Sequence, residues 1–126
     1  MEKDASVYIK HILDAIILIE ETVAGLDFET FTEVDTVNNT VVRQLTIIGE
    51  ASARLPESFK QTKPEIPWAK IISLRNVIVH DYFDIKYDVI WEILLNDLPV
   101  LKKTLLISLK NEFKENINLK GFGIQE

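Results

Sequence analysis

Residues 6–23 read SVYIKHILDAIILIEETV, and this stretch decides the fold class. Its apolar residues recur at the three- and four-residue steps of a helix with one wide buried face: Val7, Ile9, Ile12, Leu13, Ile16, Ile17, Leu18 and Val23. Gly25 follows and supplies a stop. The pattern predicts a long amphipathic helix from Ser6 to about Val23.

The next two helices are predicted from the same periodicity and from the prolines. After a connection over residues 26–31, a second helix is expected from Thr32, where T-x-x-D resembles a capping box, to Leu55. A proline-bracketed connection over residues 56–67 leaves room for one turn of helix. Pro67 suits the first position of a third helix that runs to about Val79.

The last part of the chain predicts one or two more helices. Asp84 can cap a fourth helix, and Asp97-Leu98-Pro99 either kinks that helix or ends it and starts a fifth, which runs to about Lys114. Four or five amphipathic helices with short connections predict an all-α antiparallel bundle. We expect a single domain over residues 1–115 and a loose tail over 116–126.

Composition excludes several kinds of site. A chain of 126 residues suits one domain, and the absence of cysteine excludes disulfides, thiolate zinc sites and a cysteine nucleophile. With two histidines, His11 and His80, we expect no metal site and no cofactor. Neither a signal peptide nor an apolar run of the ~20 residues that span a membrane is present, so a cytoplasmic protein is expected.

Charge is unevenly distributed along the chain. The net charge of −6 argues against a non-specific nucleic-acid binder. However, residues 1–35 carry −7, while residues 36–126 carry +1 and include all three arginines, Arg43, Arg54 and Arg75. A locally positive cleft is therefore compatible with the acidic total. Three lysines either extend a positive rim around such a cleft or belong to a solvated loop: Lys60, Lys63 and Lys70.

The segment RNVIVHDYF, residues 75–83, sets polar groups into an apolar context. Arginine offers a fixed fork of donors for phosphate oxygens, and histidine exchanges protons near neutrality. On a straight helix Ser73, Asn76 and His80 share one stripe, whereas Arg75 lies roughly 140° from His80 and about 7.5 Å away along the axis. Either the helix ends near His80, or two copies of the motif meet across a dimer interface.

A second polar stripe lies on the preceding helix. Arg43, Ile47, Glu50 and Arg54 follow one another at steps of four, three and four. If this stripe faces the third helix, Glu50 can orient Arg75 or raise the pKa of His80. The alternative is a solvated charged face with pairs inside the helix. His11, among Ile9, Ile12 and Leu13, is interpreted as structural.

Three strings resemble a known family: IGEASARL (48–55), PEIPWAKIISLRNVIVHDYF (64–83) and VIWEILLNDLPVL (89–101). Together they resemble the HEPN superfamily, and more narrowly the HepT-type toxins that are encoded beside a minimal nucleotidyltransferase antitoxin of the MNT type. The family signature R-x-x-x-x-H-x-Y is filled by Arg75, His80 and Tyr82, with Asn76 in the often polar position after the arginine.

The resemblance implies the toxin of a type VII-like toxin–antitoxin pair. It implies a helical, metal-independent endoribonuclease that acts as a homodimer, and a nucleotidyltransferase partner that neutralises it by attaching AMP to Tyr82. Arg75, Asn76 and His80 are then the expected catalytic residues, with Glu50 and Ser73 in support and RNA as the substrate.

Two alternatives stay open beside that reading. The acidic balance is also compatible with a catalytically silent helical scaffold that binds a nucleotidyltransferase or a nucleotide. Asp81, Asp84 and Asp88 could form a magnesium site, although helix caps and exposed positions account for them more simply.

Overall fold

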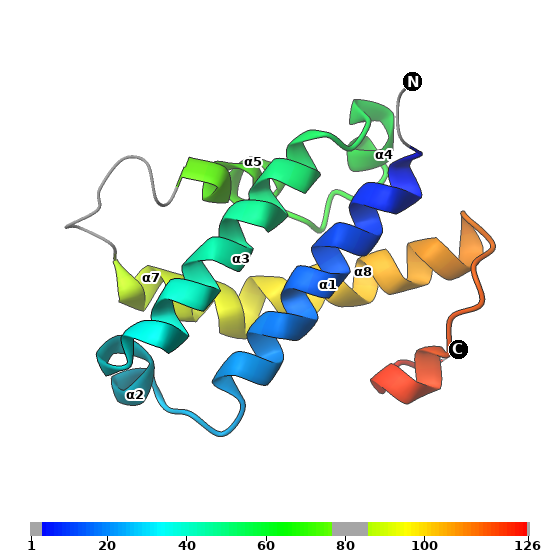
Figure 1. The fold of residues 1–126 in the computed structure, drawn as a ribbon. Helices are drawn as coiled ribbons and strands as arrows, with labels where there is room; N and C mark the ends of the chain where they lie inside the picture. Colours follow the sequence, from blue (N-terminus) through cyan, green and yellow to red (C-terminus); the bar gives the residue numbers. More distant parts are fainter. Residues whose placement is uncertain (1–3, 77–85, 126) are drawn as a thin grey trace.

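The computed structural model describes residues 4–76 and 86–125, and every regular element within them is helical. Helices α1 (Ala5–Val23) and α3 (Asp35–Ala53) lie side by side and antiparallel (Figure 1). A third long helical run crosses behind them, made of α7 (Tyr87–Glu92), the π-helical turn η2 (Ile93–Asp97) and α8 (Leu98–Asn111). The expected all-α bundle is confirmed.

Helix α1 follows its sequence pattern closely. The Asp4 side chain accepts a hydrogen bond from the backbone N–H of Ser6 and so caps the first turn. The helix ends at Val23, and Gly25 follows with a φ of 74°, which an L-residue with a side chain rarely adopts. Its core face is fully buried through Ile9, Ile12, Leu13, Ala15, Ile16 and Ile19.

The second predicted helix is in fact two helices. Asp27 caps a short α2 (Phe28–Glu33), Val34 is extended, and α3 begins at Asp35. The predicted capping box at Thr32 is wrong, because the Thr32 hydroxyl donates back to the carbonyl of Glu29. Buried Asn38 holds the corner by donating to the carbonyls of Phe31 and Thr32. This satisfies carbonyls that the end of α2 leaves free.

Asp97-Leu98-Pro99 does not end the helix. The backbone N–H of Leu98 donates to the carbonyl of Ile93, five residues back, which makes a π-helical turn. Pro99, which has no N–H, therefore sits in the first turn of α8, where a missing donor costs little. The alternative that keeps one continuous, locally distorted helix is the one observed.

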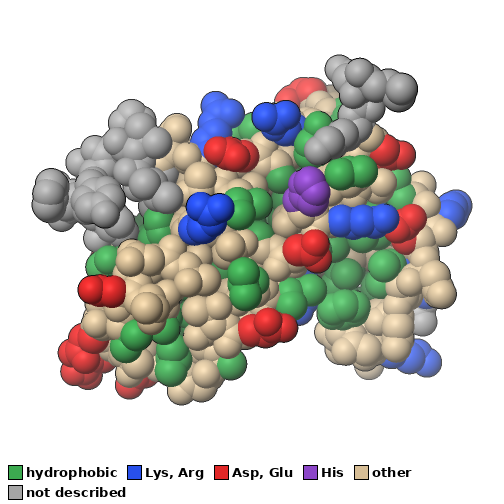
Figure 2. Space-filling model, viewed as in Figure 1, with side chains coloured by type: hydrophobic (Ala, Val, Ile, Leu, Met, Phe, Trp, Pro, Cys, Tyr) green, Lys and Arg blue, Asp and Glu red, His purple; other side chains and the backbone are tan. Residues whose placement is uncertain are grey.

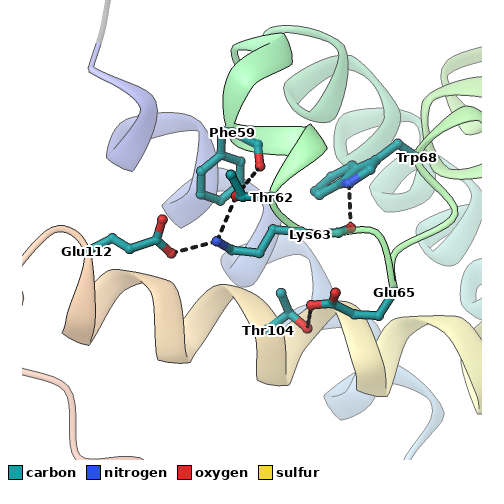
Figure 3. Close-up of polar contacts among 7 residues, drawn as sticks. All are labelled: Phe59, Thr62, Lys63, Glu65, Trp68, Thr104 and Glu112. Carbon is teal, nitrogen blue, oxygen red and sulfur yellow. Dashed lines mark hydrogen bonds and ion pairs between the residues drawn. The ribbon is translucent and has the colours of Figure 1, made fainter.

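The connection between α3 and α5 (Trp68–Ser73) contains α4 (Glu57–Gln61) and is clasped onto α8 (Figure 3). Lys63 Nζ lies 2.8 Å from Glu112 and 4.8 Å from the centre of the Phe59 ring. Trp68 Nε1 donates to the Lys63 carbonyl, and Thr104 bonds to Glu65. We call this set of contacts the lysine clasp.

Most residues in the segment 116–125 are exposed, and two of them reach the core. A 3-10 turn, η3 (Leu119–Phe122), returns the chain to the core, where Leu119 and Ile124 are buried. Asn118 caps this turn through the N–H of Gly121. None of the described helices is both long and apolar enough to cross a membrane.

Candidate functional site

The part of the R-x-x-x-x-H-x-Y motif that the structure describes lies where α5 meets α3. After Ser73 the α-helix tightens into a 3-10 turn, η1 (Leu74–Asn76). Leu74 is buried and anchors the turn, while Arg75 and Asn76 are exposed. The straight helix assumed from the sequence therefore already changes pitch before Arg75.

A glycine of α3 brings η1 against that helix. A methyl group on Gly49 would collide with the backbone nitrogen of Arg75 and lie 3.0 Å from both Arg75 Cα and the Ile72 carbonyl oxygen. Glycine is required here because the two backbones approach more closely than any side chain allows. Gly49 thus fixes where the main chain of Arg75 sits.

The remaining predicted residues divide into two groups. His80 and Tyr82, together with Asp81 and Asp84, lie outside the described residues. Ser73 is exposed, and its hydroxyl donates to the Lys70 carbonyl at 2.6 Å. The hydroxyl proton of Ser73 is therefore used in a hydrogen bond within its own helix.

The polar stripe on α3 does not face α5. Arg43, Glu50 and Arg54 are exposed, and the α3 surface that touches η1 is the one that carries Gly49. No ion pair joins Glu50 to Arg75 in the described part of the chain. Glu50 instead lines a groove against α1, so the solvated face weighed from the sequence is closer to what is observed.

The lysines and the arginines differ in how they are paired. In the described part of the chain, the ion pairs are made by lysines, each with a glutamate or aspartate: Lys10, Lys60, Lys63, Lys70 and Lys102. Among residues 4–76 and 86–125, no carboxylate pairs with any of the three arginines. The three lysines that could have extended a positive rim, Lys60, Lys63 and Lys70, are therefore already paired, whereas, among these residues, the arginines are not.

Acidic side chains gather at the opposite end of α3. Asp27, Glu29, Glu33 and Asp35 are exposed around α2, at the lower left of Figure 2. The pKa of Asp27 lies below its ordinary value because its carboxylate accepts the backbone N–H of Thr30. Helix α3 separates this acidic end from Arg54 by about 28 Å, so the acidic total does not exclude a basic region.

The described residues offer no group of three or more histidine, cysteine, aspartate or glutamate side chains that could hold a metal ion. Asp88, one of the three aspartates considered for magnesium, is exposed in the first turn of α7.

Sequence reasoning missed two features of this region. The role of Gly49 was detectable as an isolated glycine inside a long helical pattern, which indicates a packing requirement. His11 was interpreted as structural; it is exposed, about 100° around α1 from Ile12, and it lines a groove that faces α3.

Comparison with known proteins gives a consistent family. A family model described as "Ribonuclease HepT-like" matches residues 12–106. "Probable ribonuclease HepT" of Thermococcus cleftensis is 38% identical over 102 residues, which cover 81% of this chain and 93% of the relative. A "Putative RNase" of Caldanaerobacter subterraneus subsp. tengcongensis is 36% identical over 105 residues, 83% of this chain and 94% of the relative.

A longer relative also matches. "Gamma-glutamylcyclotransferase and putative RNase" of Methanocaldococcus jannaschii is 33% identical over 120 residues, which are 95% of this chain and 54% of that protein. No solved structure matches the chain.

Proposed function

The chain belongs to the family of HepT-like ribonucleases, and from this premise we propose that it is a metal-independent endoribonuclease that cuts RNA at a phosphate bound by Arg75. One observation carries the proposal. Arg75 is exposed, has no carboxylate partner in the described part of the chain, and stands on a turn fixed by the Gly49 contact. An arginine held in this way is suited to a phosphate.

The proposed reaction is a transesterification. The ribose 2′-hydroxyl attacks the neighbouring phosphorus, the bond to the 5′-oxygen breaks, and a 2′,3′-cyclic phosphate and a 5′-hydroxyl result. His80 serves as the base that accepts the 2′-hydroxyl proton or as the acid that protonates the leaving oxygen. Positioned proton transfer of this kind typically contributes about 10² to 10⁴ in rate.

Arg75 and Asn76 have electrostatic roles in this scheme. The guanidinium stabilises the additional negative charge on the pentacoordinate phosphorus, and the Asn76 amide orients the phosphate or the imidazole. Both side chains are exposed on η1, where a substrate can reach them. No step uses a metal ion, because base, acid and counter-charge all come from side chains.

A homodimer completes the proposed site. A single phosphate requires Arg75 together with a base and an acid, and two copies of the motif facing one another supply two histidines. Light scattering at micromolar concentration should give the mass of a dimer, and a strict monomer would count against a shared site.

The direct test is cleavage of RNA by purified protein in EDTA. The wild type should cut, and Arg75→Ala and His80→Ala should each lose at least about 10²-fold in rate. Unchanged cleavage by His80→Ala would remove it from the mechanism, and a requirement for magnesium would shift attention to Asp81, Asp84 and Asp88.

The proposed control of activity is AMP transfer to Tyr82 by a cognate MNT-type nucleotidyltransferase. The added phosphodiester carries a negative charge that would compete with RNA for Arg75. Tyr82→Phe keeps the ring without the acceptor oxygen, so it should stay active and escape the antitoxin. Intact mass of co-expressed protein should increase by AMP units in the wild type only; an equal increase in the variant would refute this site.

The catalytically silent scaffold is separated from this proposal by expression in bacteria. The toxin should arrest growth when expressed alone and should not do so as His80→Ala. Normal growth with both forms, together with tight binding to a nucleotidyltransferase, would favour the scaffold.

A further inference from the structure

A polar groove lies between α1 and α3, on the side of α3 away from the core. It has a volume of about 260 Å³ and is lined by Tyr8, His11, Ile47, Glu50, Ala51 and Arg54. Figure 2 shows the histidine with basic and acidic side chains around it over α1 and α3. The groove combines two rings, a guanidinium and a carboxylate in a small space.

The lining residues belong to the long helices α1 and α3, or, for Arg54, to the C-terminal cap of α3. The rings of Tyr8 and His11 meet edge to face, with their centroids 6.5 Å apart. A flat ligand can therefore stack on the face of one ring and contact the edge of the other. Arg54 caps α3, its own N–H donating to the carbonyls of Ala51 and Ser52. Neither Arg54 nor Glu50 has an ion-pair partner in the described part of the chain, so both are available to a ligand.

The groove is close to Arg75. Gly49 touches the backbone of Arg75, and Glu50, the next residue, lines the groove. With consecutive Cα atoms 3.8 Å apart, the Cα atoms of Glu50 and Arg75 are separated by no more than about 8 Å. Glu50 is therefore the edge of the groove nearest to η1, while Ile47, Ala51 and Arg54 lie on the side of α3 turned away from Gly49.

We infer that this groove is a subsite for the ribonucleotide next to the phosphate that Arg75 binds, an inference that rests on the proposed ribonuclease function. The base stacks on the face of one of the two rings, Tyr8 or His11, and contacts the edge of the other. Stacking on an aromatic side chain accepts any base. Arg54 contacts the flanking phosphate as a bidentate donor. Glu50 accepts a hydrogen bond from the ribose hydroxyl or from a base N–H.

The test compares RNA substrates of different length. A dinucleotide contains only the one phosphodiester that Arg75 binds. Tri- and tetranucleotides that are extended on one side or the other can also reach the groove. In Arg54→Gln, KM for the substrate extended towards the groove should rise about 10-fold. The kcat, the dinucleotide kinetics and the melting temperature should not change, and Arg54→Lys should recover part of the loss.

Arg43→Gln is the matched control. It removes the same charge from the same exposed stripe of the same helix, about 16 Å from Arg54 along the axis, and it does not line the groove. It should leave KM close to the wild-type value. If Arg43→Gln and Arg54→Gln raise KM equally, the effect comes from the overall charge of the protein and not from the groove, and the subsite is overturned.

A binding measurement separates this inference from the cleavage mechanism. Fluorescence anisotropy with a trinucleotide that carries a 2′-deoxy group at the scissile position reports binding without reaction, and His11→Gln and Arg54→Gln should both weaken it. If the wild type binds this probe in the groove but cuts no RNA, the proposed function fails and the subsite stands. If RNA is cut and neither variant changes binding, the subsite fails. A change in the mass of Arg54→Gln by light scattering would instead assign the groove to a protein interface and overturn the inference.

Discussion

The lysine clasp and the Gly49–Arg75 contact both hold the segment from α4 to η1 against the long helices, yet they use cations in opposite ways. In the clasp, Lys63 is paired with Glu112 and packs over Phe59. At the other contact, Arg75 is exposed without a carboxylate partner among the described residues, and the attachment is made by backbone packing against Gly49.

The difference indicates that the paired lysine stabilises the fold, whereas the unpaired arginine is available to bind a ligand. A lysine that is already paired gains little from binding a phosphate, because the existing pair must first be broken. An arginine positioned through its backbone keeps its whole guanidinium for the substrate. The comparison therefore predicts that clasp variants change stability and arginine variants change activity.

The largest effect is expected from Gly49→Ala. The new methyl group collides with backbone atoms, which cannot move aside as a flexible side chain can, so η1 must separate from α3. We expect the free energy of unfolding to fall by about 1–3 kcal/mol and cleavage to fall by about 10²-fold, because Arg75 is displaced. Urea unfolding and a cleavage assay measure both. Ala53→Ser, one turn further along α3 and half-buried, is the control and should be near wild type in both.

The next largest effect is expected from comparing Arg75→Ala, which should change activity alone, with Lys63→Met, which should change stability alone. Arg75→Ala should lower cleavage by about 10²- to 10³-fold while changing unfolding by less than about 0.5 kcal/mol, as exposed positions usually do. Lys63→Met should keep activity and lose about 1 kcal/mol of stability with its ion pair and its contact with the Phe59 ring. Melting of the Arg75 variant, or inactivity of a stable Lys63 variant, would break the distinction.

The smallest effect concerns pH and Glu112. Partial burial opposes its charged form, but the hydrogen bonds from Lys63 and Ser108 and the charge of Lys63 together outweigh burial and lower the pKa of Glu112. Since the folded pKa lies below the unfolded one, the stabilisation is complete above roughly pH 4.3 and is lost as the pH falls through the folded value.

The measurement is unfolding of the wild type and Glu112→Gln from about pH 3 to 7. The wild type should be more stable by a few tenths of a kcal/mol near neutrality, the carboxylate being 44% exposed and screened by solvent. The difference in the free energy of unfolding between the two proteins should disappear in acid. A gap that stays constant down to the lowest pH would contradict the assigned pairing.

Periodicity predicted the helices that bury a wide apolar face, and it failed where a few polar contacts decide the backbone. The extended Val34 and the corner held by Asn38 depend on bonds between residues six and seven apart, which no apolar pattern records. At Pro99 the sequence left two alternatives, a kinked helix or a new one, because a proline specifies a missing donor but not how the preceding turn adapts. The π turn was not predicted. In residues 116–125, the two buried apolar residues, Leu119 and Ile124, are too few to show a helical period.

For the site, residue type was more informative than helical geometry. Arg75 and Asn76 were identified from their chemistry and from the motif, and the structure exposes both. The spatial relation of Glu50 to Arg75 was not predictable, since it depends on which face of α3 carries Gly49. His11 was placed by its apolar neighbours in sequence, although helical rotation turns it away from them.

The central claim is that Arg75 is free to bind phosphate and Lys63 is not, and salt dependence of RNA binding tests it most directly. Each phosphate contact contributes about 0.7 to the slope of log K against log salt for a single strand. With a 2′-deoxy-blocked RNA, Arg75→Gln should lower this slope by about 0.7, while Lys63→Gln should leave it unchanged. An unchanged slope for Arg75→Gln, or an equal fall for Lys63→Gln, would contradict the account.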